Sequence, residues 1–319
     1  MTYQAFVLAA GFGTRLRPLT LHRPKPLVPV CGVPMLAHAL ALCAKHGLRR
    51  VVVNAHYLHE QVSAWAGQHE GCEVHIAVEL PEILGTGGGL KQVAQDLDER
   101  FVVVNADILT DVDLSALVHG VPEGGAAMAL RVHQEESQTY GIVAADDTGI
   151  VTRLASVATA VATGHEQTDT HFTGVHAMHR DMLDHIPDGF ACVVRTAYRE
   201  TVPKRKVRGL RHDALWMDVG DPLAYLETNL AVLRGEVTPP LDCRARSQPV
   251  PPEVTVSGEV WIGRDVQIAP GTHLKDCIVG DRAVVAGGHK TSCVIWSDVE
   301  VPRGRHERTI FHDGGALRL

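Results

Sequence analysis

The sequence predicts an α/β protein with a Rossmann-like mixed, mostly parallel sheet, followed by a short left-handed parallel β-helix. Apolar runs alternate with amphipathic segments through the first third of the chain. A proline-rich stretch, 238–252, precedes a tail in which aliphatic residues recur every six positions. We therefore expect an α/β domain over 1–235, a linker over 236–253 and a β-helix domain over 254–319.

The α/β part is expected to begin with a buried strand over 4–10, because this run is apolar and ends in small residues before Gly11. Strands are expected next over 49–54, 72–79 and 101–107, and helices over 33–46, 59–68 and 88–97. Strands that are apolar on both faces are typical of a parallel sheet covered on both sides. Ligands of such sheets bind at the carboxyl ends of the strands, where Gly11, Asn54, Glu79 and Asp107 fall.

After about residue 125 the alternation weakens, which predicts a mixed extension of the sheet. Strand-like pieces cover 126–132, 140–146, 171–178, 206–212 and 215–220, with helices expected over 189–200 and 222–233. In the tail, two six-residue series are formed by Val256, Ile262, Ile268 and Leu274 and by Val260, Val266, Thr272 and Ile278. Such aliphatics stack inward at the corners of a parallel β-helix.

The composition limits which kinds of binding partner are expected. The formal net charge is −7, and no lysine-rich or arginine-rich run occurs, which disfavours nucleic acid and anionic membranes as partners. No apolar stretch is long enough to span a membrane and no signal segment is recognisable, so a cytoplasmic protein is expected. Seven cysteines show no CxxC pairing, and nineteen histidines show no HxH or HExxH spacing. Reduced thiols and no histidine metal site are expected.

One stretch, Leu8 to Val30, is basic and contains no acidic residue; its cations are Arg15, Arg17, Arg23 and Lys25. Its GFGTRL segment lacks the third glycine of a dinucleotide fingerprint, and no GK[ST] follows as in a Walker loop. What remains is a glycine-rich loop whose N–H groups can hold phosphates.

The cations of this loop suit a phosphate ligand. Arg15 can offer a planar fork of donors to two phosphate oxygens, and Lys25, between two prolines, offers a point charge at a fixed place. Arg17 and Arg23 are expected to be solvated flanks.

Two carboxylates are candidates for a metal site. Asp107 ends a buried strand and Asp218 follows the apolar run 215–217. Two carboxylates at strand ends suit one Mg²⁺ shared with phosphate oxygens, although a capping or turn role would also explain either residue. Asp111 and Asp113 are expected near a helix N-terminus instead.

The segment LAAGFGTRLRPLT, continued by RPKPLVPVCGVPML, resembles the signature of the sugar-1-phosphate nucleotidyltransferases. The resemblance continues at LGTGGGLK (84–91), VVVNADIL (102–109), YGIV (140–143), FTGVH (172–176) and WMDVGDPLAYLETN (216–229). It implies an enzyme that joins an NTP to a sugar 1-phosphate and releases pyrophosphate. A β-helix tail also occurs in members of this family.

The resemblance also implies roles for residues. Arg15 and Lys25 would be catalytic, Asp107 and Asp218 would hold Mg²⁺, and Gly141, Thr173 and Gly174 would lie beside the sugar phosphate. The nucleotide would contact Leu8, Ala10, Gly11, Gly13, Thr14, Glu79, Gly87 and Asp107. A carboxylate only accepts hydrogen bonds, so Glu79 would favour guanine or uracil over cytosine and adenine.

The pattern departs from the family at one place: no Glu-Lys pair follows the strand after YGIV. Arg153 is a replacement for that lysine, or Lys25 acts alone. Mannose-1-phosphate guanylyltransferase is the first expectation within the class, and a uridylyltransferase acting on N-acetylmuramate 1-phosphate or another hexose 1-phosphate is the alternative. Two further alternatives are a non-catalytic subunit that binds sugar nucleotides and a cytidylyltransferase acting on an alcohol phosphate. Self-association through the short tail is expected, because its open ends need cover.

Overall fold

The computed structural model describes residues 2–319 and divides them into two compact units. Unit 1 comprises the residues up to Gly11, Ala39–Ala106 and Thr110–Trp216. Unit 2 comprises Phe12–His38, Asp107–Leu109 and Met217–Leu319. The cations Arg15 and Lys25 and the two candidate metal ligands therefore belong to the same unit.

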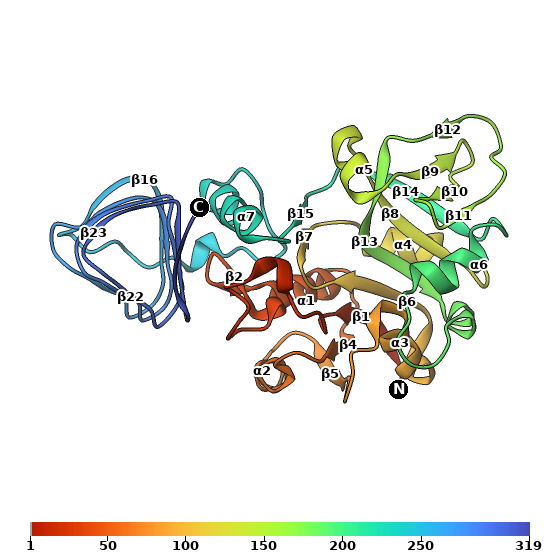
Figure 1. Ribbon diagram of the computed structural model, residues 1–319, viewed down its shortest axis with the longest axis horizontal. Helices are drawn as coiled ribbons and strands as arrows, with labels where there is room; N and C mark the ends of the chain where they lie inside the picture. The colour runs from red at the N-terminus through yellow and green to blue at the C-terminus, as the bar shows by residue number, and fades with distance from the viewer. Residues whose placement is uncertain (1) are drawn as a thin grey trace. The chain divides into compact units, whose positions relative to one another are not determined.

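Unit 1 is built on a seven-stranded sheet in the order β14-β8-β13-β6-β1-β4-β5 (Figure 1). Its strands are β1 (Tyr3–Leu8), β4 (Arg50–Ala55), β5 (Glu73–Val78), β6 (Leu97–Asn105), β8 (Ala126–Val132), β13 (Thr170–His179) and β14 (Val207–His212). β1 pairs in parallel with both β4 and β6, whereas β13 is antiparallel to β6 and β8. The predicted mixed, mostly parallel sheet is confirmed.

The helices near this sheet are α1 (Met35–Lys45), α2 (His59–Ala66), α3 (Gly85–Gln92), α4 (Leu114–Gly120), α5 (Gln134–Tyr140) and α6 (Arg199–Thr201). The helix expected over 88–97 is displaced: α3 begins earlier and contains the glycine run. A Cβ on Gly88 would lie 2.0 Å from the carbonyl oxygen of Gly189, so the glycines let another segment pack against this helix. The helix expected over 189–200 is instead a π-helical turn, Val194–Tyr198, followed by α6.

The expected mixed extension forms a four-stranded sheet in the order β11-β10-β9-β12. Its strands are β9 (Val143–Asp146), β10 (Val151–Leu154), β11 (Ala158–Thr159) and β12 (Glu166–Gln167). The strand expected over 140–146 starts late because α5 runs through Tyr140, and Gly141 follows it with φ +92°. Asp113 accepts a hydrogen bond from the Ala116 N–H as the N-cap of α4, which confirms its predicted place.

Unit 2 contains the hairpin β2 (Pro29–Val30) and β3 (Val33–Pro34), parts of β7 (Ile108–Thr110) and β15 (Trp216–Asp218), and helix α7 (Pro222–Arg234). Helix α7 begins at Asp221, whose carboxylate accepts from two backbone N–H groups, and ends at Gly235 with φ +72°. These caps explain why the sequence located this helix so closely.

The tail of unit 2, blue in Figure 1, stacks short strands in parallel, except that the last strand, β25, is antiparallel to β24. They are β16 (Thr255–Ile262), β17 (Gln267–Ile268), β18 (His273–Val279), β19 (Val284–Val285), β20 (Gly288–Thr291), β21 (Val294–Ile295), β22 (Glu300–Val301), β23 (Gly304–Glu307), β24 (Thr309–His312) and β25 (Gly315–Arg318). Paired residues lie about three hexapeptides apart, as Thr255 and His273 do. This arrangement is compatible with the predicted β-helix.

One expectation for the tail needs correction. Val256 was expected to point inward but is 38% exposed, and Val254 packs in the core instead, in a strand whose register shifts after Ser257. The proline-rich stretch, expected as a linker, contacts the first coil of the tail. Cys243 is buried, and its carbonyl accepts a hydrogen bond from Trp261 Nε1 of the first coil at 2.8 Å.

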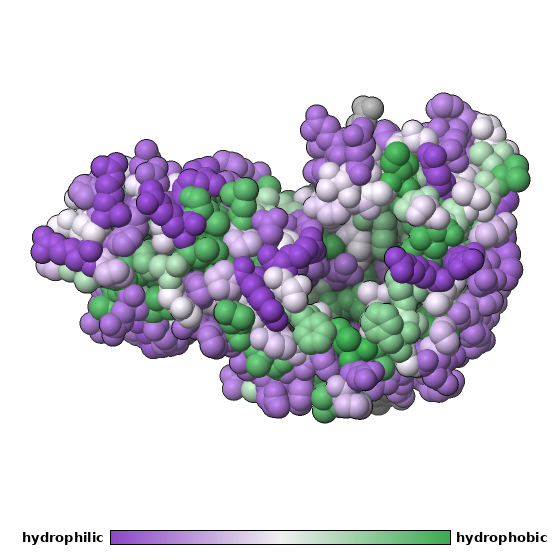
Figure 2. Space-filling model, in the orientation of Figure 1, coloured by the Kyte–Doolittle hydropathy of each residue, from purple (hydrophilic) through white to green (hydrophobic). Residues whose placement is uncertain are grey.

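On the face drawn in Figure 2, hydrophobic residues form small groups between hydrophilic ones. Among residues 2–319, no helix is both long and apolar enough to cross a membrane.

Candidate active site

The glycine-rich loop folds back on itself within unit 2. Gly13 adopts φ +62° just before a 3₁₀ turn, Thr14–Leu16, and the buried Leu16 anchors that turn. A Cβ on Gly13 would lie 3.2 Å from the Cβ of Lys25, so a glycine allows the two parts of the loop to approach. Thr20 Oγ1 donates a hydrogen bond to the Gly13 carbonyl at 2.8 Å, which holds this fold of the loop.

Lys25 points at a carboxylate. It begins a second 3₁₀ turn, Lys25–Leu27, and the prolines on either side of it are buried. Its Nζ lies 2.6 Å from Asp107 Oδ2. The Lys25 side chain is 11% exposed and that of Asp107 29%, so the ion pair lies at the edge of the protein interior. The predicted fixed place of this ammonium is therefore beside Asp107.

The second carboxylate lies next to the first. The Val219 N–H donates to the Asp107 carbonyl at 3.0 Å, which brings the residue after Asp218 against Asp107. Arg15 Nη1 is 3.8 Å from Asp218 Oδ2, and its side chain is 68% exposed. A Cβ on Gly220 would come within 3.0 Å of both partners. Unit 2 thus gathers two carboxylates and two cations.

The fit of this group to a magnesium ion rests on its donor set. Asp107 and Asp218 offer only oxygen, and each is at least partly accessible. Mg²⁺ binds through one or two carboxylates and fills its remaining positions with phosphate oxygens and water. The residues present therefore suit Mg²⁺, with Lys25 and Arg15 limiting repulsion between the carboxylates.

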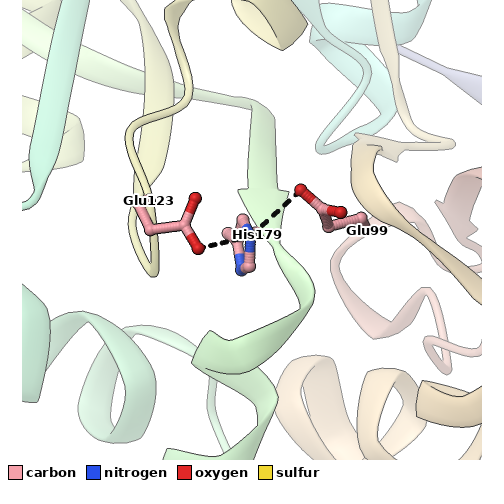
Figure 3. A group of neighbouring side chains, drawn as sticks. All are labelled: Glu99, Glu123 and His179. Carbon is pink, nitrogen blue, oxygen red and sulfur yellow. Dashed lines mark ion pairs between the residues drawn. The ribbon is translucent and has the colours of Figure 1, made fainter.

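A second group of possible metal-binding side chains lies in unit 1. Among the described residues, one group of three, Glu99, Glu123 and His179 of unit 1, has ligand atoms within 4.8 Å of one another (Figure 3). His179 Nδ1 accepts from the Asp181 N–H at 3.3 Å, so a neutral ring carries its hydrogen on Nε2. That nitrogen lies 3.5 and 3.7 Å from the two carboxylates, and Arg100 pairs with both as well. His179 Nε2 therefore has no free lone pair to offer a metal ion. The cluster is better described as an ion-pair network.

The strand ends of unit 1 are joined by a series of buried hydrogen bonds. Asn54 accepts from the Ala9 N–H at 2.6 Å and donates through Nδ2 to Glu79 Oε1 at 2.7 Å. Glu79 Oε2 accepts from the Leu84 N–H at 2.7 Å, and a Cβ on Gly89 would lie 2.5 Å from Oε1. The ends of β1, β4 and β5 therefore meet at one edge, as the sequence predicted.

These hydrogen bonds change the expectation for Glu79. Its side chain has no exposed surface, and both carboxylate oxygens accept hydrogen bonds from the protein. What the structure shows is a tie between the strand ends and the start of α3, where the buried Gly87 lies. A direct contact between Glu79 and a base stays a prediction. The Asn54 amide, which the sequence placed only at a strand end, connects Ala9 to Glu79.

Glu79→Gln should weaken this tie, since one oxygen that now accepts becomes an NH₂ group facing a donor. Asn54 cannot turn to compensate, because its oxygen is committed to Ala9. We expect the free energy of unfolding in urea to fall by roughly 1–3 kcal/mol. Glu82→Gln, at an exposed position nearby, is the matched control. An unfolding free energy equal to that of the control would contradict the role.

The remaining predicted residues lie as follows. Leu8 ends β1, Ala10 is buried, and Gly11 and Thr14 are exposed. Gly141 and Arg153 line one open pocket of about 530 Å³. Arg153 Nε is buried with no hydrogen-bond partner among the described residues.

Thr173 and Gly174 lie elsewhere in unit 1, at an irregular point in the pairing of β13 with β8. Thr173 Oγ1 donates to the Ala129 carbonyl, and Trp216 Nε1 donates to the Thr173 carbonyl at 2.9 Å. Gly174 has φ +80°, and both residues are buried. Of the three residues predicted beside the sugar phosphate, only Gly141 therefore lines the pocket that contains Arg153.

Residues 4–235 match the nucleotidyl transferase family, and the chain belongs to it. It is 31% identical to the mannose-1-phosphate guanylyltransferase of Mycobacterium tuberculosis over 91% of this chain and 82% of the relative. It is 33% identical to the N-acetylmuramate alpha-1-phosphate uridylyltransferase of Neisseria meningitidis over 68% of this chain and 93% of the relative. The crystal structure of HddC from Yersinia pseudotuberculosis has the same fold, with a TM-score of 0.56 at 21% identity over 72% of this chain and 98% of that one. The predicted family and enzyme class are confirmed.

Proposed function

We propose that the protein joins a nucleoside triphosphate to a sugar 1-phosphate, giving a nucleoside diphosphate sugar and pyrophosphate. The observation that carries this proposal is the group in unit 2: Lys25 lies 2.6 Å from Asp107, and Arg15 lies 3.8 Å from Asp218. Membership of the nucleotidyl transferase family supports the reaction class.

In this reaction an oxygen of the sugar phosphate attacks the α-phosphorus of the triphosphate. The new bond is P–O to the sugar phosphate, and the bond that breaks joins the α-phosphorus to the oxygen bridging to the β-phosphate. Pyrophosphate leaves with that electron pair, and no proton must be removed from the nucleophile. Catalysis is then mainly positioning and neutralisation of charge.

Residues of the protein supply both the positioning and the neutralisation of charge. Lys25 holds its ammonium beside the reacting phosphates, fixed by the prolines and by Asp107. Arg15, exposed and only loosely paired, is available to bind the departing phosphates. Asp107 and Asp218 would hold Mg²⁺, which when bound neutralises phosphate charge. In place of the lysine that is missing after YGIV, we propose either Arg153, which lines the Gly141 pocket of unit 1 and whose Nη2 lies 3.8 Å from Glu166 Oε2, or Lys25 acting alone.

For the substrates we propose GTP and mannose 1-phosphate. The support is the similarity to the Mycobacterium tuberculosis enzyme, which extends over 91% of this chain and thus includes part of the tail. The alternative, UTP with N-acetylmuramate 1-phosphate, is supported by 33% identity that covers 68% of the chain. Residues 1–235 would be the catalytic domain, 236–253 the linker and 254–319 a β-helix through which copies associate in the cytoplasm.

The test is a screen for pyrophosphate release with four NTPs against a panel of sugar 1-phosphates in the presence of Mg²⁺. We expect release with GTP and mannose 1-phosphate, and none without the sugar phosphate. Preference for UTP would move the assignment to the alternative, and preference for CTP with an alcohol phosphate would replace it. Binding of a sugar nucleotide without release in any combination would identify a non-catalytic subunit.

A further inference from the structure

Arg23 is not the solvated flank that the sequence predicted. Its Nε and Nη2 donate to the two carboxylate oxygens of Asp313 at 3.1 and 3.0 Å. Its guanidinium also lies 4.5 Å from the ring centroid of Trp296. A guanidinium is well suited to a bidentate salt bridge with a carboxylate and to stacking on an aromatic ring. Arg23 makes both contacts. The side chain is 25% exposed.

Both partners of Arg23 belong to the end of the β-helix. Asp313 lies in the turn between β24 and β25, and Trp296 directly follows β21. Trp296 is buried, and its Nε1 donates to the Tyr225 hydroxyl at 2.8 Å. That hydroxyl in turn donates to the Pro29 carbonyl at 2.7 Å.

These contacts hold the loop at two points that bracket Lys25. Arg23 precedes the lysine by two residues with Pro24 between them, and Pro29 follows shortly after Lys25 and Pro26. Prolines restrict the backbone, so a segment fixed at both ends has little freedom to move the lysine. The place of Nζ at Asp107 thus depends on groups at the far end of the chain.

We propose that Arg23 is a positioning residue, through which the end of the β-helix fixes Lys25 in its working place. The proposal rests on the proposed function, since it concerns the same lysine. Partly exposed ion pairs contribute little to stability, so the Arg23–Asp313 pair acts on the loop rather than on folding. A small displacement of a group that contacts the reacting atoms costs much of its effect on rate.

The test compares Arg23→Gln, Asp313→Asn, the double variant and the charge reversal Arg23→Asp with Asp313→Arg, all in the full-length protein. Because a partly exposed ion pair is weak, its loss misplaces Lys25 in only part of the molecules, and we expect each single change to lower kcat about 3- to 10-fold. The double variant should be no slower than the slower single one, because both changes break the same pair. KM should stay within about threefold and the melting temperature within about 3 °C.

The matched control is Arg264→Gln, which breaks a similar pair with Asp281 inside the tail. We expect it to keep the kcat of the unchanged protein, and the charge reversal to recover activity above either single variant. Single variants that keep kcat within twofold, or that lose it only in proportion to lost folded protein in circular dichroism, would overturn the positioning role. If the unchanged protein releases no pyrophosphate with any substrate pair, the proposed function fails instead.

Discussion

Asp107→Asn is expected to abolish pyrophosphate release while the melting curve stays close to that of the unchanged protein. The substitution keeps the shape of the side chain but removes the charge that faces Lys25 Nζ at 2.6 Å and that would bind Mg²⁺. Losing a group that neutralises phosphate charge should lower kcat by about 10³-fold or more. The folded state should lose little, because partly exposed ion pairs contribute about 0–1 kcal/mol.

Initial rates of pyrophosphate release and a thermal melt check this expectation together. Asp111→Asn is the matched control, because Asp111 is an exposed carboxylate that follows the same strand and lies outside the cluster. A fully active Asp107 variant would show that this carboxylate does not take part in the reaction. A variant that melts far below the control would make Asp107 a structural residue.

Lys25→Met should lower kcat by about 10²- to 10³-fold, since a preorganised charge aimed at the reacting phosphates is lost. Methionine has a similar length, so the packing between the buried prolines is largely kept. Lys25→Arg should not restore the rate, because the planar guanidinium cannot place its charge where the ammonium lies.

Steady-state kinetics at saturating nucleotide and sugar phosphate measure this effect. Arg17→Met, an exposed cation of the same loop, is the control for a general loss of positive charge. Equal losses in the two variants would mean that the loop acts through its net charge alone. A lysine variant with unchanged kcat would remove Lys25 from the mechanism.

The α/β core was predictable because burial on both faces leaves a clear pattern in the sequence. Strands β1, β4 and β6 contain the apolar runs 5–8, 51–53 and 101–104, and α7 has both an N-cap aspartate and a C-terminal glycine. The glycines of α3 misled the prediction because the contact that requires them comes from the distant Gly189. Local propensity cannot register such a partner.

The candidate site was also only partly predictable from the sequence. Lys25, Asp107, Arg15 and Asp218 could be named from the motif and from their places at strand ends, and the structure brings them together in unit 2. The burial of Glu79 and the pairing of Arg23 could not, because each depends on partners from other parts of the chain. An isolated arginine in a basic loop carries no local mark of the carboxylate it will meet.

The composition of unit 2 has a consequence for the order in which the protein folds. The strands at the start of unit 1 can pair as soon as Asn105 has been made, but Arg23 and Asp313 are separated by 290 residues. During synthesis the segment 12–38 emerges long before 217–319, the segment that completes its unit. Contacts between such distant segments are slow to form because a long loop must close first. We therefore expect the loop that contains Arg15 and Arg23 to reach its final shape only after β1, β4 and β6 have paired and the C-terminal segment has been made.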